Sequence, residues 1–299
     1  MSVIKENSYK AWLLAIRPRT LSGAAIPVLL GSALAYSDGA FKWFPALVCL
    51  VFAVLMQIAA NFINDLYDFL KGTDTEERLG PKRACAQGWI SEKGMKKGIA
   101  FTILLACAAG SMLLFYGGWE LILVGMACLL GAYFYTAGPY PLAYYGWGDV
   151  LVIIFFGFIP VGITYYIQAH TWNIAVTVVS LISGFAVDTL LVVNNYRDRE
   201  TDKKNKKNTL VVRFGEPFGR YLYLFLGICA SLFALYFLYE KNYRAALLPQ
   251  FYLIFHFITW KKMKEIFQGK ELNIILGETS RNILIIGILL VLGIITGIN

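Results

Sequence analysis

Apolar residues run along most of this chain in stretches separated by short polar connections. A helix of about 20 apolar residues is long enough to cross a hydrocarbon core of ~30 Å. Judged by that length, the pattern predicts nine membrane-spanning helices, at residues 12–36, 43–70, 98–117, 119–137, 147–168, 172–195, 217–239, 243–260 and 282–298. The first span contains Arg17 and Pro18, so we expect a broken or tilted helix there.

The connections and the composition agree with a membrane protein. No polar stretch is long enough to form an independent core, and 58% of the residues are hydrophobic whereas 15% are charged. Met1 to Lys10 lack the apolar segment of a signal peptide, so we expect no removed leader. The sequence therefore predicts an all-α integral membrane protein, with one bundle of about nine helices forming a single domain over residues 1–299.

Lys and Arg gather in alternate connections, after the second, sixth and eighth predicted spans. Because cytoplasmic loops collect these residues, we expect the N-terminus and these three loops in the cytoplasm. The same bias accounts for the net charge of +8, so no nucleic-acid partner is expected. The predicted location is the cell (inner) membrane, with a multi-pass chain.

Two acidic clusters lie at matching cytoplasmic ends of predicted spans. The second predicted span ends in the first cluster, Asn61, Asn64, Asp65 and Asp68. The second cluster, at the end of the sixth span, consists of Asn194, Asn195, Asp198 and Asp202. Residues three and four apart share a helix face, and ionisable residues in a membrane chain mark functional sites. Carboxylate and amide oxygens suit Mg²⁺, which is often shared with substrate phosphates, so a diphosphate is the expected ligand.

Basic residues follow both clusters and could hold phosphate oxygens beside the metal. These candidates are Lys71, Arg78, Lys82, Arg83, Arg197 and Lys207. The alternative for either cluster alone is a solvated helix end or an interhelical salt bridge, but two such clusters at equivalent places favour a site. Aromatic residues, Tyr135 among them, form an interface belt or line a cavity where they stabilise a carbocation.

Four stretches resemble a known family. They are residues 61–83, residues 138–149, residues 194–202 with 209–213, and the opening at 12–21. Together they are similar to the UbiA-type intramembrane aromatic prenyltransferases, and within that superfamily to the branch that acts on 1,4-dihydroxy-2-naphthoate in menaquinone biosynthesis. The resemblance covers most of residues 11–215.

The resemblance implies an Mg²⁺-dependent enzyme that takes a polyprenyl diphosphate and 1,4-dihydroxy-2-naphthoate as substrates. It implies metal binding and catalysis by Asp65, Asp68, Asp198 and Asp202, with Asn64 and either Asn194 or Asn195 assisting. The naphthoate ring would attack the allylic cation left by the departing diphosphate and lose CO₂, giving a demethylmenaquinol. Arg17, Lys82 and Arg83 are candidates for holding the acceptor carboxylate, and Asn61 is a further candidate for substrate binding.

Two departures from the family pattern affect these assignments. The first motif resembles Asn-x-x-x-Asp-x-x-x-Asp, but Gly72 occupies its third place, so either Asp65 or Asp74 would supply the remaining carboxylate. After Asp202 the family commonly has Gly-Lys, where this chain has Lys206 and Lys207. We expect Lys207 to keep the phosphate role and Lys206 to change only the flexibility of the loop.

Three alternatives stay open at this point. The first is a UbiA-type enzyme with another acceptor, such as 4-hydroxybenzoate or homogentisate. The second is a cation-coupled transporter, whose carboxylates would be expected near the bilayer midplane in interrupted helices. The third is a lipid-head-group phosphotransferase, although its Asp-Gly-x-x-Ala-Arg element is absent from the sequence.

Overall fold

A computed structural model describes residues 4–73 and 78–297, and every regular element in these ranges is helical. The α-helices are α1 Tyr9–Ile16, α2 Pro18–Ser37, α3 Trp43–Leu70, α4 Glu92–Gly117, α5 Leu121–Thr136, α6 Gly148–Ile153, α7 Thr164–Ala169, α8 Ile174–Lys204, α9 Leu210–Phe214, α10 Glu216–Phe233, α11 Tyr243–Leu247, α12 Tyr252–Ile266 and α13 Leu272–Thr296. Three 3₁₀ segments, η1 Leu142–Tyr145, η3 Ala234–Leu238 and η4 Leu248–Phe251, and one π-helix, η2 Ile154–Ile163, join them. The predicted all-α fold is confirmed.

Seven helices in the described residues are long and apolar enough to cross a membrane. Helix α5 is apolar but has only 16 residues, and the predicted span 243–260 is divided among α11, η4 and α12. The predicted count of nine is therefore not confirmed, although an apolar helical segment occupies each predicted position. The chain is a multi-pass membrane protein.

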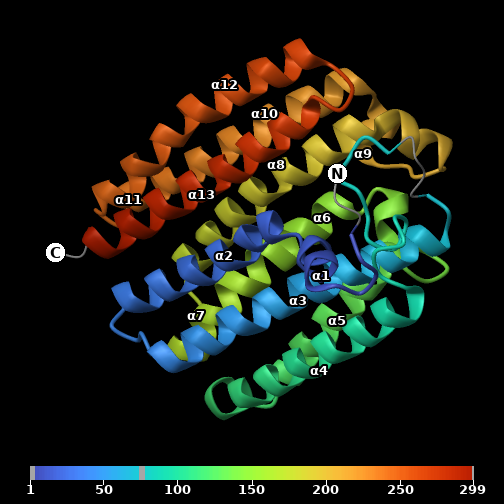
Figure 1. The fold of residues 1–299 in the computed structure, drawn as a ribbon. Helices are drawn as coiled ribbons and strands as arrows, with labels where there is room; N and C mark the ends of the chain where they lie inside the picture. The colour runs from blue at the N-terminus through green and yellow to red at the C-terminus, as the bar shows by residue number, and fades with distance from the viewer. Residues whose placement is uncertain (1–3, 74–77, 298–299) are drawn as a thin grey trace.

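The helices pack as one layered bundle (Figure 1). Helices α10, α12 and α13 lie together with α8 beside them, and α3, α4 and α5 lie on the opposite side. Helix α2 packs against both groups, through α13 and α3. The largest buried cluster joins α2, η2, α8, α10 and α13 through residues such as Leu30, Ile182 and Leu290.

The predicted break in the first span is confirmed at Arg17. This residue has the left-handed φ of 55°, and Pro18 begins α2, where its missing N–H costs no helical hydrogen bond. The Asn61 side chain of α3 donates to the Ile16 carbonyl at 2.9 Å and to Thr20 Oγ1 at 3.0 Å. The break is thus held against α3 by an amide that satisfies the exposed end of α1.

The fifth predicted span changes from α-helix to π-helix at Ile154, and Pro160 lies inside the π-helix. Proline cannot donate a backbone hydrogen bond and clashes with the carbonyl four residues earlier, which is Phe156. Ser183 Oγ of α8 donates to that carbonyl at 2.6 Å, so the neighbouring helix supplies a side-chain donor to the backbone of η2. A Cβ on Gly157 would overlap the Ser180 carbonyl oxygen of α8, so the missing side chain permits this close contact.

Two helix boundaries differ from the prediction in ways that matter for the site. Helix α8 continues to Lys204, nine residues past the predicted end at 195, so Asp198 and Asp202 lie on the helix itself. Helix α13 begins at Leu272 rather than 282. Its polar first turns depress the hydropathy of that stretch, which is why the predicted span started too late.

Candidate functional site

One large cavity, with a volume of about 1430 Å³, runs through the bundle between α2, α3, α4, α5, η2, α8 and the start of α13. One end of the cavity, at the last turns of α3 and α8, is polar, whereas the remainder is lined mainly by apolar side chains. The polar lining includes Arg17, Asn61, Asn64, Asp68, Arg78, Arg83, Asn194, Asn195, Arg197, Asp198, Asp202 and Lys207. The structure therefore brings both predicted clusters, which are more than 120 residues apart in the chain, to one cavity.

The last turns of α3 present Asn64 and Asp68 to the cavity. The buried Arg83, from the connection between α3 and α4, donates from Nη2 to Asn64 Oδ1, and the same nitrogen lies 3.5 Å from Asp68 Oδ2. Asn64 Nδ2 in turn donates to Thr136 Oγ1 of α5 at 2.9 Å. These contacts orient the Asn64 amide oxygen and the Asp68 carboxylate toward the guanidinium group of Arg83.

Asp65 lies beside these residues in the sequence but does not line the cavity. Its side chain is 1% exposed, and its oxygens accept hydrogen bonds from the backbone N–H groups of Ala84 at 3.0 Å and Cys85 at 2.9 Å. Arg17 Nη2 lies 3.9 Å from Asp65 Oδ2. Both carboxylate oxygens therefore anchor the segment that carries Arg83.

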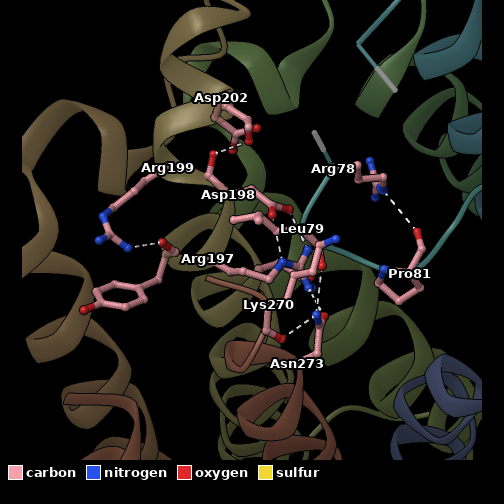
Figure 2. Close-up of polar contacts among 12 residues, drawn as sticks. Arg78, Leu79, Pro81, Arg197, Asp198, Arg199, Asp202, Lys270 and Asn273 are labelled. Carbon is pink, nitrogen blue, oxygen red and sulfur yellow. Dashed lines mark hydrogen bonds and ion pairs between the residues drawn. The ribbon is translucent and has the colours of Figure 1, made fainter. Parts of the chain in front are cut away.

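Helix α8 presents Asp198 in a fixed orientation (Figure 2). The buried Arg197 donates from Nε to Asp198 Oδ1 at 2.7 Å and from Nη2 to Oδ2 at 2.5 Å. Its Nη1 donates to Asn273 Oδ1 of α13 at 2.9 Å, and Asn273 Nδ2 donates to the Leu79 carbonyl at 2.8 Å. A chain of side-chain contacts thus links α8, α13 and the connection after α3.

Asp202 lies one turn farther along α8. Lys207 Nζ lies 3.4 Å from Asp202 Oδ1, while the buried Oδ2 has no hydrogen-bond partner in the described part of the chain. Lys207 also lies over the Tyr144 ring, 5.9 Å from its centre. A buried carboxylate oxygen at the cavity wall whose lone pairs accept no hydrogen bond is suited to bind a cation.

Several predicted residues have other surroundings. Lys71 caps α3, donates to the Thr136 carbonyl and lies 4.6 Å from the centre of the Tyr144 ring, but it does not line the cavity. Burial lowers the pKa of Lys71, and the neighbouring Asp68 opposes that shift. Lys82 is exposed and does not line the cavity, and Asp74 lies outside the described residues.

The donors at the polar end fit a hard divalent cation. Mg²⁺ prefers oxygen ligands. Carboxylate and side-chain amide oxygens are supplied here by Asn64, Asp68, Asn194, Asp198 and Asp202. Within the described ranges no three His, Cys, Asp or Glu side chains come together as a metal-binding group. An ion here would therefore need amide oxygens, water or substrate oxygens to complete its coordination.

Three polar residues in or near this region were not predicted from the sequence. Asn273 lines the cavity and lies in a stretch that the prediction left outside the last span. Asp149 and Asp188 are buried on α6 and α8, and Oδ1 of each has no hydrogen-bond partner among the described residues. A carboxylate within span 172–195 was a usable signal for Asp188, whereas nothing in the sequence distinguishes Asn273 from other loop amides.

The chain is similar in sequence to a known family of membrane enzymes. Residues 24–270 match the UbiA prenyltransferase family. Over 241 residues the chain is 36% identical to the 1,4-dihydroxy-2-naphthoate octaprenyltransferase of Escherichia coli (strain K12), covering 77% of this chain and 78% of that protein. It is 35% identical to the Mycobacterium leprae protein of the same name, covering 72% of this chain and 73% of the relative.

Solved structures share the fold. A UbiA homolog from Archaeoglobus fulgidus bound to GPP and Mg²⁺ superposes with a TM-score of 0.68 at 17% identity, covering 96% of this chain and 99% of that one. The same homolog bound to DMAPP and Mg²⁺ gives a TM-score of 0.67, also at 17% identity, covering 96% of this chain and 98% of that one. The resemblance inferred from the acidic motifs is confirmed, and the chain belongs to the UbiA prenyltransferase family.

Proposed function

We propose that this protein transfers a polyprenyl group from a polyprenyl diphosphate to 1,4-dihydroxy-2-naphthoate with loss of CO₂, giving the demethylmenaquinol of menaquinone biosynthesis. The observation that carries the proposal is the large cavity, in which carboxylates of α3 and α8 meet cations of the connections that follow these helices, at one end of a long apolar space. Several relatives that are 33–37% identical carry the name of that naphthoate activity. An anionic head and a hydrocarbon tail are what such a cavity accommodates.

Mg²⁺ is the proposed cofactor, held by Asp68, Asp198 and Asp202 with the amide oxygens of Asn64 and of Asn194 or Asn195. When bound, this ion would offset the negative charge of the diphosphate as it becomes the leaving group. Asp65 is not included, because both of its oxygens accept backbone hydrogen bonds away from the cavity. Asp65 is instead proposed to position the segment bearing Arg83.

The cations of the chain bind and orient the diphosphate. Arg78, Arg83 and Lys207 line the polar end and would hold phosphate oxygens, which stabilises the charge that develops on the leaving group. Arg197 acts differently, because its guanidinium is committed to Asp198 and Asn273. It fixes the direction in which the Asp198 carboxylate points.

The reaction follows from this placement. The carbon–oxygen bond of the allylic diphosphate breaks, and its electron pair leaves with the diphosphate. The electron-rich naphthoate ring forms the new carbon–carbon bond to the allylic cation, and loss of the carboxylate as CO₂ restores aromaticity. Tyr135 and Tyr144 line the cavity near the polar end, where their rings would stabilise the cation and exclude water.

The proposed setting is the cell (inner) membrane, with the polar end of the cavity facing the cytoplasm and the whole chain forming one membrane domain. The basic connections after α3, α8 and α12 support that orientation. The naphthoate must then reach the cavity from the cytoplasmic side, and the prenyl diphosphate from the bilayer. Arg17 and Arg83 remain the candidates for the acceptor carboxylate, since Lys82 does not line the cavity.

An acceptor competition assay tests the proposed function. The purified protein is incubated with Mg²⁺, farnesyl or a longer prenyl diphosphate, and equal concentrations of 1,4-dihydroxy-2-naphthoate, 4-hydroxybenzoate and homogentisate. We expect the decarboxylated prenylnaphthalenediol as the main product and no turnover in EDTA until Mg²⁺ is restored. Product formed only from a non-naphthoate ring, or turnover without a divalent metal, would refute the assignment.

A further inference from the structure

Gln57 is a polar residue in the part of the cavity wall that is mainly apolar. It lies near the middle of α3, lines the cavity, and is about 10 Å along the helix axis from Asn64 at the polar end. Neither the proposed Mg²⁺ site nor the diphosphate involves this amide. A polar side chain at such a depth in a membrane-spanning helix indicates that it binds a partner.

The hydrogen bonds of Asn61 fix the orientation of the Gln57 amide. Asn61 Nδ2 donates to the Ile16 carbonyl at 2.9 Å and to Thr20 Oγ1 at 3.0 Å. The Thr20 hydroxyl donates its own hydrogen to the Arg17 carbonyl at 2.9 Å, so it accepts the bond from Asn61. Both Asn61 amide hydrogens are thus committed, and Asn61 Oδ1 accepts from Gln57 Nε2 at 3.2 Å. Gln57 therefore directs its NH₂ group to Asn61 and leaves its oxygen for another partner.

The Gln57 oxygen can be reached from the cavity. Within the described part of the chain, no backbone or side-chain group donates to Gln57 Oε1. Ala53 and Ala60, four residues before and three residues after Gln57, share its helix face and also line the cavity. Their methyl side chains are too short to cover the amide. The cavity wall therefore presents a hydrogen-bond acceptor that requires a donor from a ligand.

The chemistry of the two substrates identifies that donor. A prenyl chain has no N–H or O–H group, and the diphosphate accepts hydrogen bonds at the opposite, polar end of the cavity. In 1,4-dihydroxy-2-naphthoate, the hydroxyl beside the carboxylate forms an internal hydrogen bond with it. The 4-hydroxyl is the free donor, and it points toward the middle of α3 when the carboxylate faces the cations of the polar end.

We infer that Gln57 Oε1 accepts a hydrogen bond from the 4-hydroxyl of the naphthoate acceptor, which makes Gln57 a specificity-determining residue. This inference rests on the proposed function, because it takes a hydroxylated aromatic acid as the second substrate. An acceptor ring without this hydroxyl would leave the Gln57 oxygen unpaired in the closed site, and it would bind less tightly.

Two ligands that differ only in the 4-hydroxyl test the inference. They are 1,4-dihydroxy-2-naphthoate and 1-hydroxy-2-naphthoate, and their dissociation constants are measured anaerobically in nanodiscs with saturating Mg²⁺ and a non-transferable prenyl thiolodiphosphate. We expect the wild type to bind the dihydroxy acid about tenfold more tightly. Gln57→Met keeps the length of the side chain without the amide oxygen, so it should bind the two acids with affinities within about twofold of each other.

Two further variants serve as controls. Met56→Leu changes the adjacent cavity-lining side chain with little change in volume, and it should keep the tenfold preference. Gln57→Glu retains an oxygen acceptor on a side chain of the same length, so the preference should persist even though its charge weakens binding of both anions. The affinity of each variant for the prenyl thiolodiphosphate alone shows whether it is folded.

The possible failures are distinguishable. A wild type without preference for the dihydroxy acid, or an equal loss of affinity for both acids in Gln57→Met, would show that Gln57 only orients Asn61. Loss of the preference in Met56→Leu would also overturn the inference. If the wild type binds neither naphthoate but binds 4-hydroxybenzoate or homogentisate, the proposed function fails and the role of Gln57 fails with it.

Discussion

Asp65 and Asp68 show how two carboxylates three residues apart on one helix have different roles. Asp68 lines the cavity beside Arg83, whereas Asp65 accepts two backbone hydrogen bonds in a fully buried position. The sequence pattern could not separate them, because both match the spacing of a polar helix face. The difference depends on where residues 84–85 return to α3, which is a tertiary contact.

Exchanging each of these carboxylates for its amide separates structure from chemistry. In Asp65→Asn the side-chain NH₂ faces a backbone N–H, so we expect a loss of about 1–3 kcal/mol in the free energy of unfolding. In Asp68→Asn we expect an unchanged unfolding midpoint and a loss of prenyl transfer of about 100-fold or more. Unfolding curves in mixed micelles and initial rates measure the two effects.

The opposite pattern would contradict these roles. If Asp65→Asn folds with full stability but is inactive, Asp65 belongs to the binding site itself. If Asp68→Asn keeps substantial activity, the proposed metal site is wrong.

At the scale of elements, small residues set how closely the helices approach. The π-helix η2 packs closely on α8 because Gly157 lies against the Ser180 carbonyl and Gly184, and Ser183 of α8 donates to the Phe156 carbonyl of η2. This contact holds the cavity wall formed by η2 and α8 in place. The glycine at 125 has the opposite surroundings, since nothing contacts the position of its missing side chain.

Alanine substitution at these two glycines distinguishes a packed position from an open one. Gly157→Ala places a methyl group against backbone atoms of α8, so we expect destabilisation of about 1–3 kcal/mol. Gly125→Ala meets open space within a helix, where alanine is favoured over glycine by up to about 1 kcal/mol, so its stability should be unchanged or higher. Equal destabilisation of the two variants in a micellar unfolding assay would show that the packing difference does not govern stability.

For the whole molecule, the sequence predicted the all-helical membrane fold, the break at Arg17 and the meeting of two acidic helix ends. The fold was predicted from hydropathy, the break from Pro18, and the shared site from the i, i+4 spacing of the two acidic clusters. All three signals can be read from short stretches of sequence. The observed start of α13 at Leu272 and the contacts of Asn273 were not predicted. Polar residues at the end of a helix look like a loop when only hydropathy is considered.

The ends of α3 and α8 are proposed to form one Mg²⁺ and diphosphate site. A double-mutant cycle tests it most directly, using Mg²⁺-dependent affinity for a non-transferable prenyl diphosphate analogue in the wild type, Asp68→Asn, Asp198→Asn and the double variant. If both carboxylates serve one ion, either single change removes most of the Mg²⁺-dependent affinity and the double change removes little more, with a coupling energy of about 1–3 kcal/mol. Losses that simply add, or Mg²⁺-dependent binding that survives in the double variant, would show that the two carboxylates do not share one ion.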